Sequence, residues 1–219
     1  MNSKLIVIDG LDGSGKTTQF DIIRRELGEK YNVTPISFPD YDKPSSTLVK
    51  MYLNGEIADN AADVNAYAAS SFYAADRYVS YKKYWEKGYR DGVILASRYV
   101  SSNAIHQMSK LPRDEWEDYL NWLEDYEYNR LGLPRPDCVV FLDMPVEISQ
   151  RLMTERYNGD ESRKDIHESN VGYLKACRKS ALYAAEKCGW SVVECSRGGK
   201  PLSIEEITEN LRKIIYEKL

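Results

Sequence analysis

Apolar residues recur along this chain in two different spacings. Short unbroken runs, such as Val-Ile-Leu-Ala at 93–96 and Cys-Val-Val-Phe-Leu at 138–142, are typical of strands that are covered on both faces. Longer segments, such as 17–29, carry apolar residues three and four positions apart, which is typical of amphipathic helices. The two patterns alternate, so the sequence predicts strands interleaved with helices.

The whole pattern predicts the element order. The predicted strands span 4–9, 32–38, 92–97, 138–143 and 190–195. The predicted helices span 17–29, 45–54, 62–87, 99–109, 112–131, 145–156, 167–188 and 203–217. Because alternating strands and helices form a parallel sheet with helices on both faces, we expect an α/β fold of three layers. It would contain a five-stranded parallel sheet, with residues 1–219 in a single domain.

The turn after the first predicted strand carries the clearest chemical signal. Residues 10–17 read Gly-Leu-Asp-Gly-Ser-Gly-Lys-Thr, which matches the phosphate-loop pattern G-x-x-x-x-G-K-[ST]. A strand before the motif and a helix after it let loop N–H groups and a helix N-terminus converge on phosphate oxygens. We therefore expect a P-loop NTPase fold that binds ATP through Gly10, Leu11, Asp12, Gly13, Ser14, Gly15, Lys16, Thr17 and Thr18. The alternative is a glycine turn that binds nothing.

Three residues in and beside this loop have expected roles. Lys16 would reach the terminal phosphates of ATP, and the Thr17 hydroxyl would bind Mg²⁺. Asp9 is a second candidate for the metal site, and the alternative is that Asp9 only braces the loop. The expected cofactor is therefore Mg²⁺, bound together with ATP.

Polar residues also follow the second and third predicted strands, where ligands bind in parallel α/β folds. They occupy the segments 37–41 and 97–107. On the helix between these strands, Tyr73 and Arg77 are four residues apart and share one helical face. An aromatic ring beside a guanidinium can hold a nucleobase and its phosphate. The sequence thus predicts a second binding site next to the phosphate loop.

A basic segment near 151–164 interrupts two predicted helices. It contains Arg156 and Arg163 and an Asn-Gly pair, and it predicts a flap near 154–166 that brings positive charge over phosphates. The alternative interpretation of these arginines is a solvated, charged turn.

Together these segments resemble the thymidylate kinase family of nucleoside monophosphate kinases. The resemblance covers essentially the whole chain. It rests on the phosphate loop, on an A-x-D-R segment at 74–77, on the run 98–107 that begins Arg-Tyr and ends in Gln, and on the flap. It implies transfer of a phosphoryl group from ATP to a pyrimidine nucleoside monophosphate, commonly by a homodimer.

The resemblance also implies the roles of individual residues. Lys16, Arg98, Arg156 and Arg163 would be catalytic cations, of which Arg98 would bridge the acceptor phosphate and the transferred group. Asp12 would bind the 3′-hydroxyl of the acceptor. The base and its surroundings would be contacted by Phe38, Pro39, Tyr73, Arg77, Asn103, His106 and Gln107. Within that set, Tyr73 would stack on the base, Arg77 would contact the base or phosphate, and Asn103 would bind the Watson–Crick edge.

Several of these residues could instead have a purely structural role. Tyr73 could pack in the core, and His106 could be a structural histidine. Asp76 and Arg77 could form a surface ion pair on their helix.

The chain departs from the family pattern in three places. Ser97 stands where an aspartate is usual, and Asp40 and Tyr41 stand in the segment after the second strand that usually carries an arginine gripping the acceptor phosphate. His106 replaces a tyrosine associated with discrimination against a 2′-hydroxyl. These departures affect the acceptor site more than the fold.

Composition narrows the class of protein. A net charge of −4 argues against a nucleic-acid scaffold, and no stretch is apolar enough to predict a membrane span. The first strand begins close to Met1, which leaves no room for a signal peptide. The four cysteines form no C-x-x-C pair, so we expect buried free thiols and a cytoplasmic protein. The Ala- and Tyr-rich helix 62–87 is the candidate surface for a homodimer.

The leading hypothesis is an ATP:dTMP phosphotransferase that works by direct in-line transfer. A second hypothesis keeps the reaction but changes the acceptor to another pyrimidine nucleotide or to a nucleoside, since the phosphate-gripping arginine is missing. A third is a nucleotide-binding module with weak catalysis.

Overall fold

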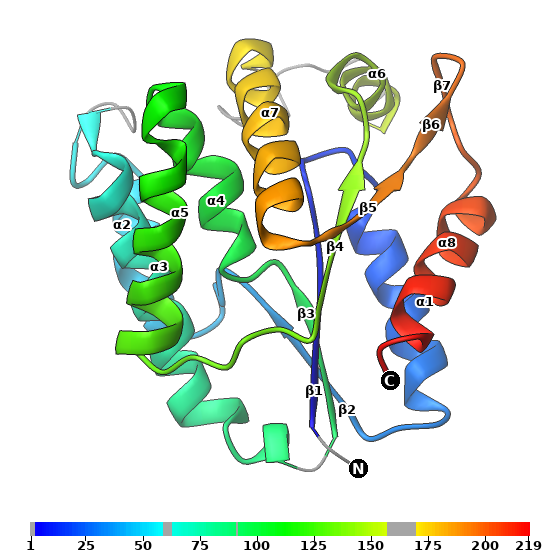
Figure 1. Ribbon diagram of the computed structural model, residues 1–219, viewed down its shortest axis with the longest axis horizontal. Helices are drawn as coiled ribbons and strands as arrows, with labels where there is room; N and C mark the ends of the chain where they lie inside the picture. Colours follow the sequence, from blue (N-terminus) through cyan, green and yellow to red (C-terminus); the bar gives the residue numbers. More distant parts are fainter. Residues whose placement is uncertain (1–2, 59–62, 91, 157–169) are drawn as a thin grey trace.

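The computed structural model describes residues 3–58, 63–90, 92–156 and 170–219. Its centre is a sheet of five strands in the order β2-β3-β1-β4-β5, and every neighbouring pair is parallel. The strands are β1 (Lys4–Gly10), β2 (Val33–Ser37), β3 (Val93–Ser97), β4 (Cys138–Asp143) and β5 (Ser191–Glu194). The predicted five-stranded parallel sheet, with boundaries accurate to about one residue, is confirmed (Figure 1).

Helices connect these strands across both faces. The α-helices are α1 (Lys16–Gly28), α2 (Thr47–Leu53), α3 (Ala66–Ser80), α4 (Ser101–His106), α5 (Trp116–Glu124), α6 (Val146–Arg156), α7 (Val171–Cys188) and α8 (Ile204–Tyr216). Short 3₁₀ turns are η1 (Pro44–Ser46), η4 (Gly88–Arg90), η5 (Met108–Lys110) and η6 (Arg113–Glu115). Two π-helical turns, η3 (Tyr81–Trp85) and η7 (Asp125–Arg130), extend α3 and α5.

The central strand shows why the sheet is covered twice. Leu5 and Val7 pack into a core with side chains of α4 and α5, whereas Ile6 and Ile8 pack on the other face against α1 and α8. Side chains of a strand alternate between faces, so an unbroken apolar run supplies two cores at once. Figure 1 shows α1 and α8 together on one side of the sheet and α3, α4, α5 and α7 on the other.

Several predicted helices are subdivided in the structure. The single helix predicted over 62–87 is α3 followed by the π-turn η3, and the one predicted over 112–131 is η6, α5 and η7. The prediction over 99–109 likewise divides into α4 and η5. Apolar periodicity continues through these irregular turns, so spacing alone did not reveal them. The short hairpin of β6 (Ser196–Arg197) and β7 (Lys200–Pro201) was not predicted.

Other expectations concern caps, thiols and membranes. A capping box opens α8, the helix predicted over 203–217, with Ser203 and Glu206 bonding to one another's backbone N–H groups. All four cysteines are free; three are buried and Cys188 is half-buried. Within the described ranges, no helix is both long and apolar enough to cross a membrane.

Candidate active site

The phosphate loop follows the end of β1 and leads directly into α1. Gly13 and Gly15 have positive φ values of 75° and 82°, which glycine adopts without strain. A Cβ on Gly13 would lie 2.9 Å from the Cβ of Ser149 on α6, so no side chain fits there. A Cβ on Gly15 would meet nothing within 4 Å, so the loop is open on that side. The open side lies at the N-terminus of α1, where unpaired N–H groups favour an anion.

The side chains of this loop match its expected chemistry. Thr17 and Thr18 are exposed in the first turn of α1, where the Thr17 hydroxyl can reach a metal ion. The Ser14 hydroxyl is buried and has no hydrogen-bond partner among the described residues. Burial and the nearby Arg98 lower the pKa of Lys16 from 10.5 to about 8, although Asp12 and Asp9 oppose this shift. Lys16 and Arg98 thus lie close to one another beside the carboxylates of Asp12 and Asp9.

Asp9 is fully buried and both of its carboxylate oxygens are occupied. One accepts a hydrogen bond from the Gly10 N–H at 2.8 Å. The other accepts from the hydroxyls of Ser101 and Ser102 at 2.7 and 2.8 Å. These bonds tie the loop to the start of α4, so they favour the bracing role over metal binding. In the part of the chain that the structure describes, no cluster of three acidic, His or Cys side chains could hold a metal.

A cavity of about 270 Å³ opens beside the loop, near the lower end of the size range for small-molecule sites. All nine residues predicted for the acceptor site line it, namely Asp12, Phe38, Pro39, Tyr73, Arg77, Arg98, Asn103, His106 and Gln107. They come from the phosphate loop, the end of β2, the helices α3 and α4, and the residues that join α4 to its neighbours. Segments far apart in sequence thus meet at one site.

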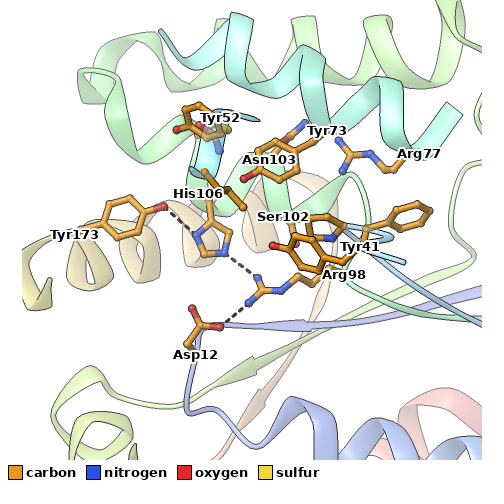
Figure 2. A pocket seen from close by; sticks show the side chains of 14 residues that line it. Asp12, Tyr41, Tyr52, Tyr73, Arg77, Arg98, Ser102, Asn103, His106 and Tyr173 are labelled. Carbon is orange, nitrogen blue, oxygen red and sulfur yellow. Dashed lines mark hydrogen bonds and ion pairs between the residues drawn. The ribbon is translucent and has the colours of Figure 1, made fainter. Parts of the chain in front are cut away.

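Arg98 lies at the centre of a chain of hydrogen bonds across this cavity (Figure 2). Its Nη2 donates to the Asp12 carboxylate at 2.7 Å, and its Nη1 donates to His106 Nε2 at 2.9 Å. Because an arginine only donates, His106 Nε2 accepts and the neutral ring carries its proton on Nδ1. That nitrogen lies 3.2 Å from the Tyr173 hydroxyl of α7. His106 therefore has polar partners on both ring nitrogens at the cavity, an arrangement that fits a binding role as well as the structural alternative.

The backbone and charge of Arg98 are unusual. Its φ of 66° is the positive value of a non-glycine residue, a conformation that costs energy and often marks functional sites. Burial opposes the charge of its guanidinium, but Asp12 and Asp9 outweigh burial and raise the pKa of Arg98. The side chain is therefore a permanent cation between the phosphate loop and the cavity.

Arg77 is held by a residue behind the cavity wall. It is fully buried, and its Nε and Nη2 donate to the two oxygens of Glu127 at 2.7 and 2.6 Å. Glu127 is fully buried as well. The alternative of a surface pair between Asp76 and Arg77 is therefore wrong, because both residues are buried and the partner of Arg77 is Glu127.

The remaining predicted side chains also meet the cavity. Tyr73 lines it and makes an edge-to-face contact with Tyr52, with ring centroids 6.3 Å apart. Gln107 is buried, and its Oε1 has no partner among the described residues. Phe38 and Pro39, joined by a cis peptide bond, form part of the wall.

The positions that depart from the family pattern have distinct surroundings. Tyr41 is half exposed and lines the cavity. Burial and the neighbouring Asp76 raise the pKa of Asp40. Ser97 ends β3, in register with Ile8 of β1 and Ser37 of β2.

Sequence reasoning missed four residues that line the cavity, Tyr52, Leu53, Ser102 and Tyr173, and it missed Glu127 behind them. Glu127 lies in an acidic and aromatic stretch that resembles an exposed helix face. Two predicted catalytic arginines cannot be placed: Arg163 and most of the flap near 154–166 lie outside the described residues, and the side chain of Arg156 is not described.

Comparisons with known proteins agree with this geometry. The family model for thymidylate kinase matches residues 8–207. Thymidylate kinase of Mycobacterium tuberculosis is 30% identical over 187 residues, which cover 82% of this chain and 84% of that protein. A probable thymidylate kinase of Pyrobaculum aerophilum is 24% identical over 97% of this chain and 98% of its own length. The solved structure of thymidylate kinase from Candida albicans covers 99% of this chain and 92% of its own, with a TM-score of 0.69 and 24% identity. This chain belongs to the thymidylate kinase family.

Proposed function

We propose that this protein transfers the γ-phosphoryl group of ATP directly to dTMP, giving dTDP and ADP. The observation that carries the proposal is the position of Arg98, which lies between Asp12 of the phosphate loop and the acceptor cavity. Phosphoryl transfer requires two nucleotides in line and cations around the moving group. A phosphate loop beside a separate nucleoside-sized cavity provides for both nucleotides.

The roles of the cations follow from their places. Lys16 would bind the terminal phosphates of ATP, and Arg98 would contact the acceptor phosphate and the transferred group. The Thr17 hydroxyl, exposed in the first turn of α1, would bind the Mg²⁺ that accompanies ATP. Mg²⁺ would neutralise phosphate charge as it develops. Arg156 and Arg163 stay predicted contributors.

The first test is ADP production from MgATP with dTMP, dUMP, dCMP, UMP, dGMP and thymidine supplied in turn. We expect rapid turnover with dTMP. Turnover with thymidine alone would favour the nucleoside alternative raised by Tyr41. Measurable ATP binding without turnover on any acceptor would contradict the proposal and favour a binding module.

A substitution of the loop lysine tests the chemistry of the loop. Lys16→Ala should abolish turnover, because it removes the cation closest to the transferred phosphates. Circular dichroism of the variant should match that of the wild type, since Lys16 is only half-buried at the loop. Retained turnover would contradict the assignment.

We also propose that the protein forms a homodimer through α3 and η3. Supporting this, Tyr78, Val79 and Tyr84 on these elements are large apolar side chains exposed by 38, 40 and 45%. Sedimentation equilibrium would give twice the chain mass, and Val79→Lys should shift the protein toward monomer.

A further inference from the structure

The buried carboxylate of Glu127 contacts two residues that line the acceptor cavity but does not line the cavity itself. It lies in the π-helical turn η7, and π-turns are frequent at functional sites. Its side chain is fully buried, and its backbone carbonyl accepts a hydrogen bond from the Leu133 N–H at 3.0 Å. Glu127 is therefore held rigidly behind the site.

Glu127 fixes the orientation of the Asn103 side-chain amide. Asn103 Nδ2 lies 3.0 Å from Glu127 Oε1 and 3.2 Å from the backbone oxygen of Ser70. Both neighbours only accept hydrogen bonds, so the amide NH₂ must face them and the amide oxygen cannot. Both N–H groups of this amide are thus used. Asn103 lines the cavity, and we infer that the side-chain atom it can offer to a ligand is Oδ1, an acceptor.

The backbone of Asn103 is fixed as well. The Tyr119 hydroxyl donates to its carbonyl at 3.3 Å and is also 2.6 Å from the Ser70 hydroxyl. This network joins α3, α4 and α5 around a single amide. Flipping the amide would place its oxygen against Glu127 and Ser70, leaving buried groups unpaired.

Glu127 also determines which N–H groups Arg77 can donate to a ligand. The carboxylate occupies Nε and one N–H of Nη2, and Nη1 is 3.4 Å from the Tyr99 carbonyl. Arg77 lines the cavity, and we infer that its remaining guanidinium N–H groups are the ones available to a ligand there. Figure 2 shows Arg77, Tyr73 and Asn103 together on the side of the cavity away from Asp12. This side therefore presents a donor from Arg77 next to an acceptor from Asn103.

We propose that Glu127 is a positioning residue that sets this donor–acceptor order and thereby selects bases with a carbonyl next to a ring N–H. Thymine and uracil present O4 beside N3–H, which complements the order. Cytosine presents an amino donor beside an acceptor nitrogen, which opposes it. Guanine also presents a carbonyl next to a ring N–H, so this donor–acceptor order does not exclude it. The size of the cavity must exclude guanine instead. The inference rests on the proposed function and adds the residue that determines which pyrimidine edge is recognised.

The test measures kcat/KM for dTMP and dCMP in the wild type, Glu127→Gln and Glu127→Asp. A glutamine at position 127 can donate a hydrogen bond toward Asn103, so the Asn103 amide can turn its oxygen toward residue 127. Aspartate keeps a charge beside Arg77 but is one methylene too short to maintain both contacts. In each variant the dTMP-to-dCMP ratio should fall about tenfold or more, as loss of a designed hydrogen-bond pattern predicts. Glu127→Asp is the variant to use if Glu127→Gln does not fold.

Two controls separate positioning from general stability. Glu26→Gln removes a carboxylate from another bidentate pair, with Arg212 at 3.0 and 2.8 Å, away from the cavity. Its ratio should stay at the wild-type value. In an Asn103→Ala background, Glu127→Asp should change the ratio by less than it does in the wild-type background, because the amide is gone and only Arg77 can still transmit the change.

The outcomes are distinct. A dTMP-to-dCMP ratio unchanged within twofold in Glu127→Asp would overturn the inference while leaving the kinase proposal intact, and so would a full further effect in the Asn103→Ala background. A wild type that uses no nucleoside monophosphate would instead overturn the proposed function. Binding enthalpies for dTMP and dCMP, measured by calorimetry, give the same comparison without turnover.

Discussion

Arg77 and Arg98 line the same cavity but are held in opposite ways. Arg77 is 1% exposed, and both of its strong bonds go to one carboxylate that is itself inaccessible to solvent. The Arg98 side chain is 18% exposed and divides its bonds between Asp12, which is 29% exposed, and His106. The first arginine is a fixed part of the wall. The second can exchange its partners for phosphate oxygens without leaving a charge buried and unpaired.

The difference follows from where each lies in the fold. Arg77 lies in the interior of α3, packed against η7, so its position is set before any ligand arrives. Arg98 lies at the end of β3 with a φ of 66°, where the backbone aims the side chain across the phosphate loop. A rigid arginine suits recognition of a base, and an exchangeable one suits a phosphoryl group that moves during the reaction.

Breaking the fixed pair should have the largest effect on stability. Arg77→Met leaves the Glu127 carboxylate buried without a counter-charge, which should cost about 3–5 kcal/mol of unfolding free energy. The double variant Arg77→Met, Glu127→Met should recover part of this, because an apolar pair needs no charge compensation but Asn103 loses the acceptor of one N–H group. Urea denaturation measures both. A loss below about 1 kcal/mol in the single variant would show that the pair is not the anchor we describe.

The exchangeable arginine should show the reverse pattern. Arg98→Met should lower kcat by about 10²–10³-fold, as removal of one transition-state donor does. Its unfolding free energy should change by less than about 1 kcal/mol, because Asp12 is partly solvated and Asp9 keeps its hydrogen bonds from Gly10, Ser101 and Ser102. Steady-state kinetics and the same urea titration give both values. Unfolding comparable to that of Arg77→Met would break the comparison.

The influence of Arg98 on Lys16 predicts a proton uptake on nucleotide binding. The pKa of Lys16 is lowered to about 8 by burial and by Arg98, so above pH 8 the free protein holds a neutral lysine. ATP phosphates favour the charged form, so binding near pH 9 should take up most of one proton. Calorimetry in buffers of different ionisation enthalpy measures it. Uptake should be smaller in Arg98→Met and absent in Lys16→Ala.

The same shift has a defined sign for stability. Because the folded-state pKa of Lys16 lies below its ordinary value of 10.5, the unfolded chain binds more protons between these values. The contribution of Lys16 to unfolding free energy should therefore rise with pH from about 8 upward. A contribution that falls over this interval, judged by difference from Lys16→Ala, would contradict the shift.

The smallest expected effect concerns the far end of the Arg98 network. Tyr173→Phe removes the hydroxyl 3.2 Å from His106 Nδ1 and should lower kcat/KM for the acceptor by about 2–10-fold, as loss of one hydrogen bond predicts. Tyr183→Phe, on the same helix, is the matched control, because its ring packs against Arg113 and Trp116. Equal effects of the two variants would remove the reason to assign Tyr173 a part in the network.

Much of the fold and part of the site could be predicted from local sequence. The phosphate loop, the strands and the Ser203 capping box depend on residues a few positions apart, so their patterns are complete in short segments. The nine residues predicted for the acceptor site were named from the family resemblance, and all of them line one cavity. The irregular turns η3 and η7 were missed because apolar spacing continues through them.

Only the tertiary structure decided how each arginine is held. Glu127 lies 50 residues from Arg77, and Tyr173 lies 67 residues from His106, so no local pattern joins them. Burial then changes their meaning. An acidic residue that looks like part of a solvated face becomes, at 0% exposure, a carboxylate that must be paired and that orients its neighbours. The sequence alone determined that phosphate is bound beside a parallel sheet. Packing determined which of two arginines is fixed and which is free to move, because the cost of an unpaired charge depends on the water around it.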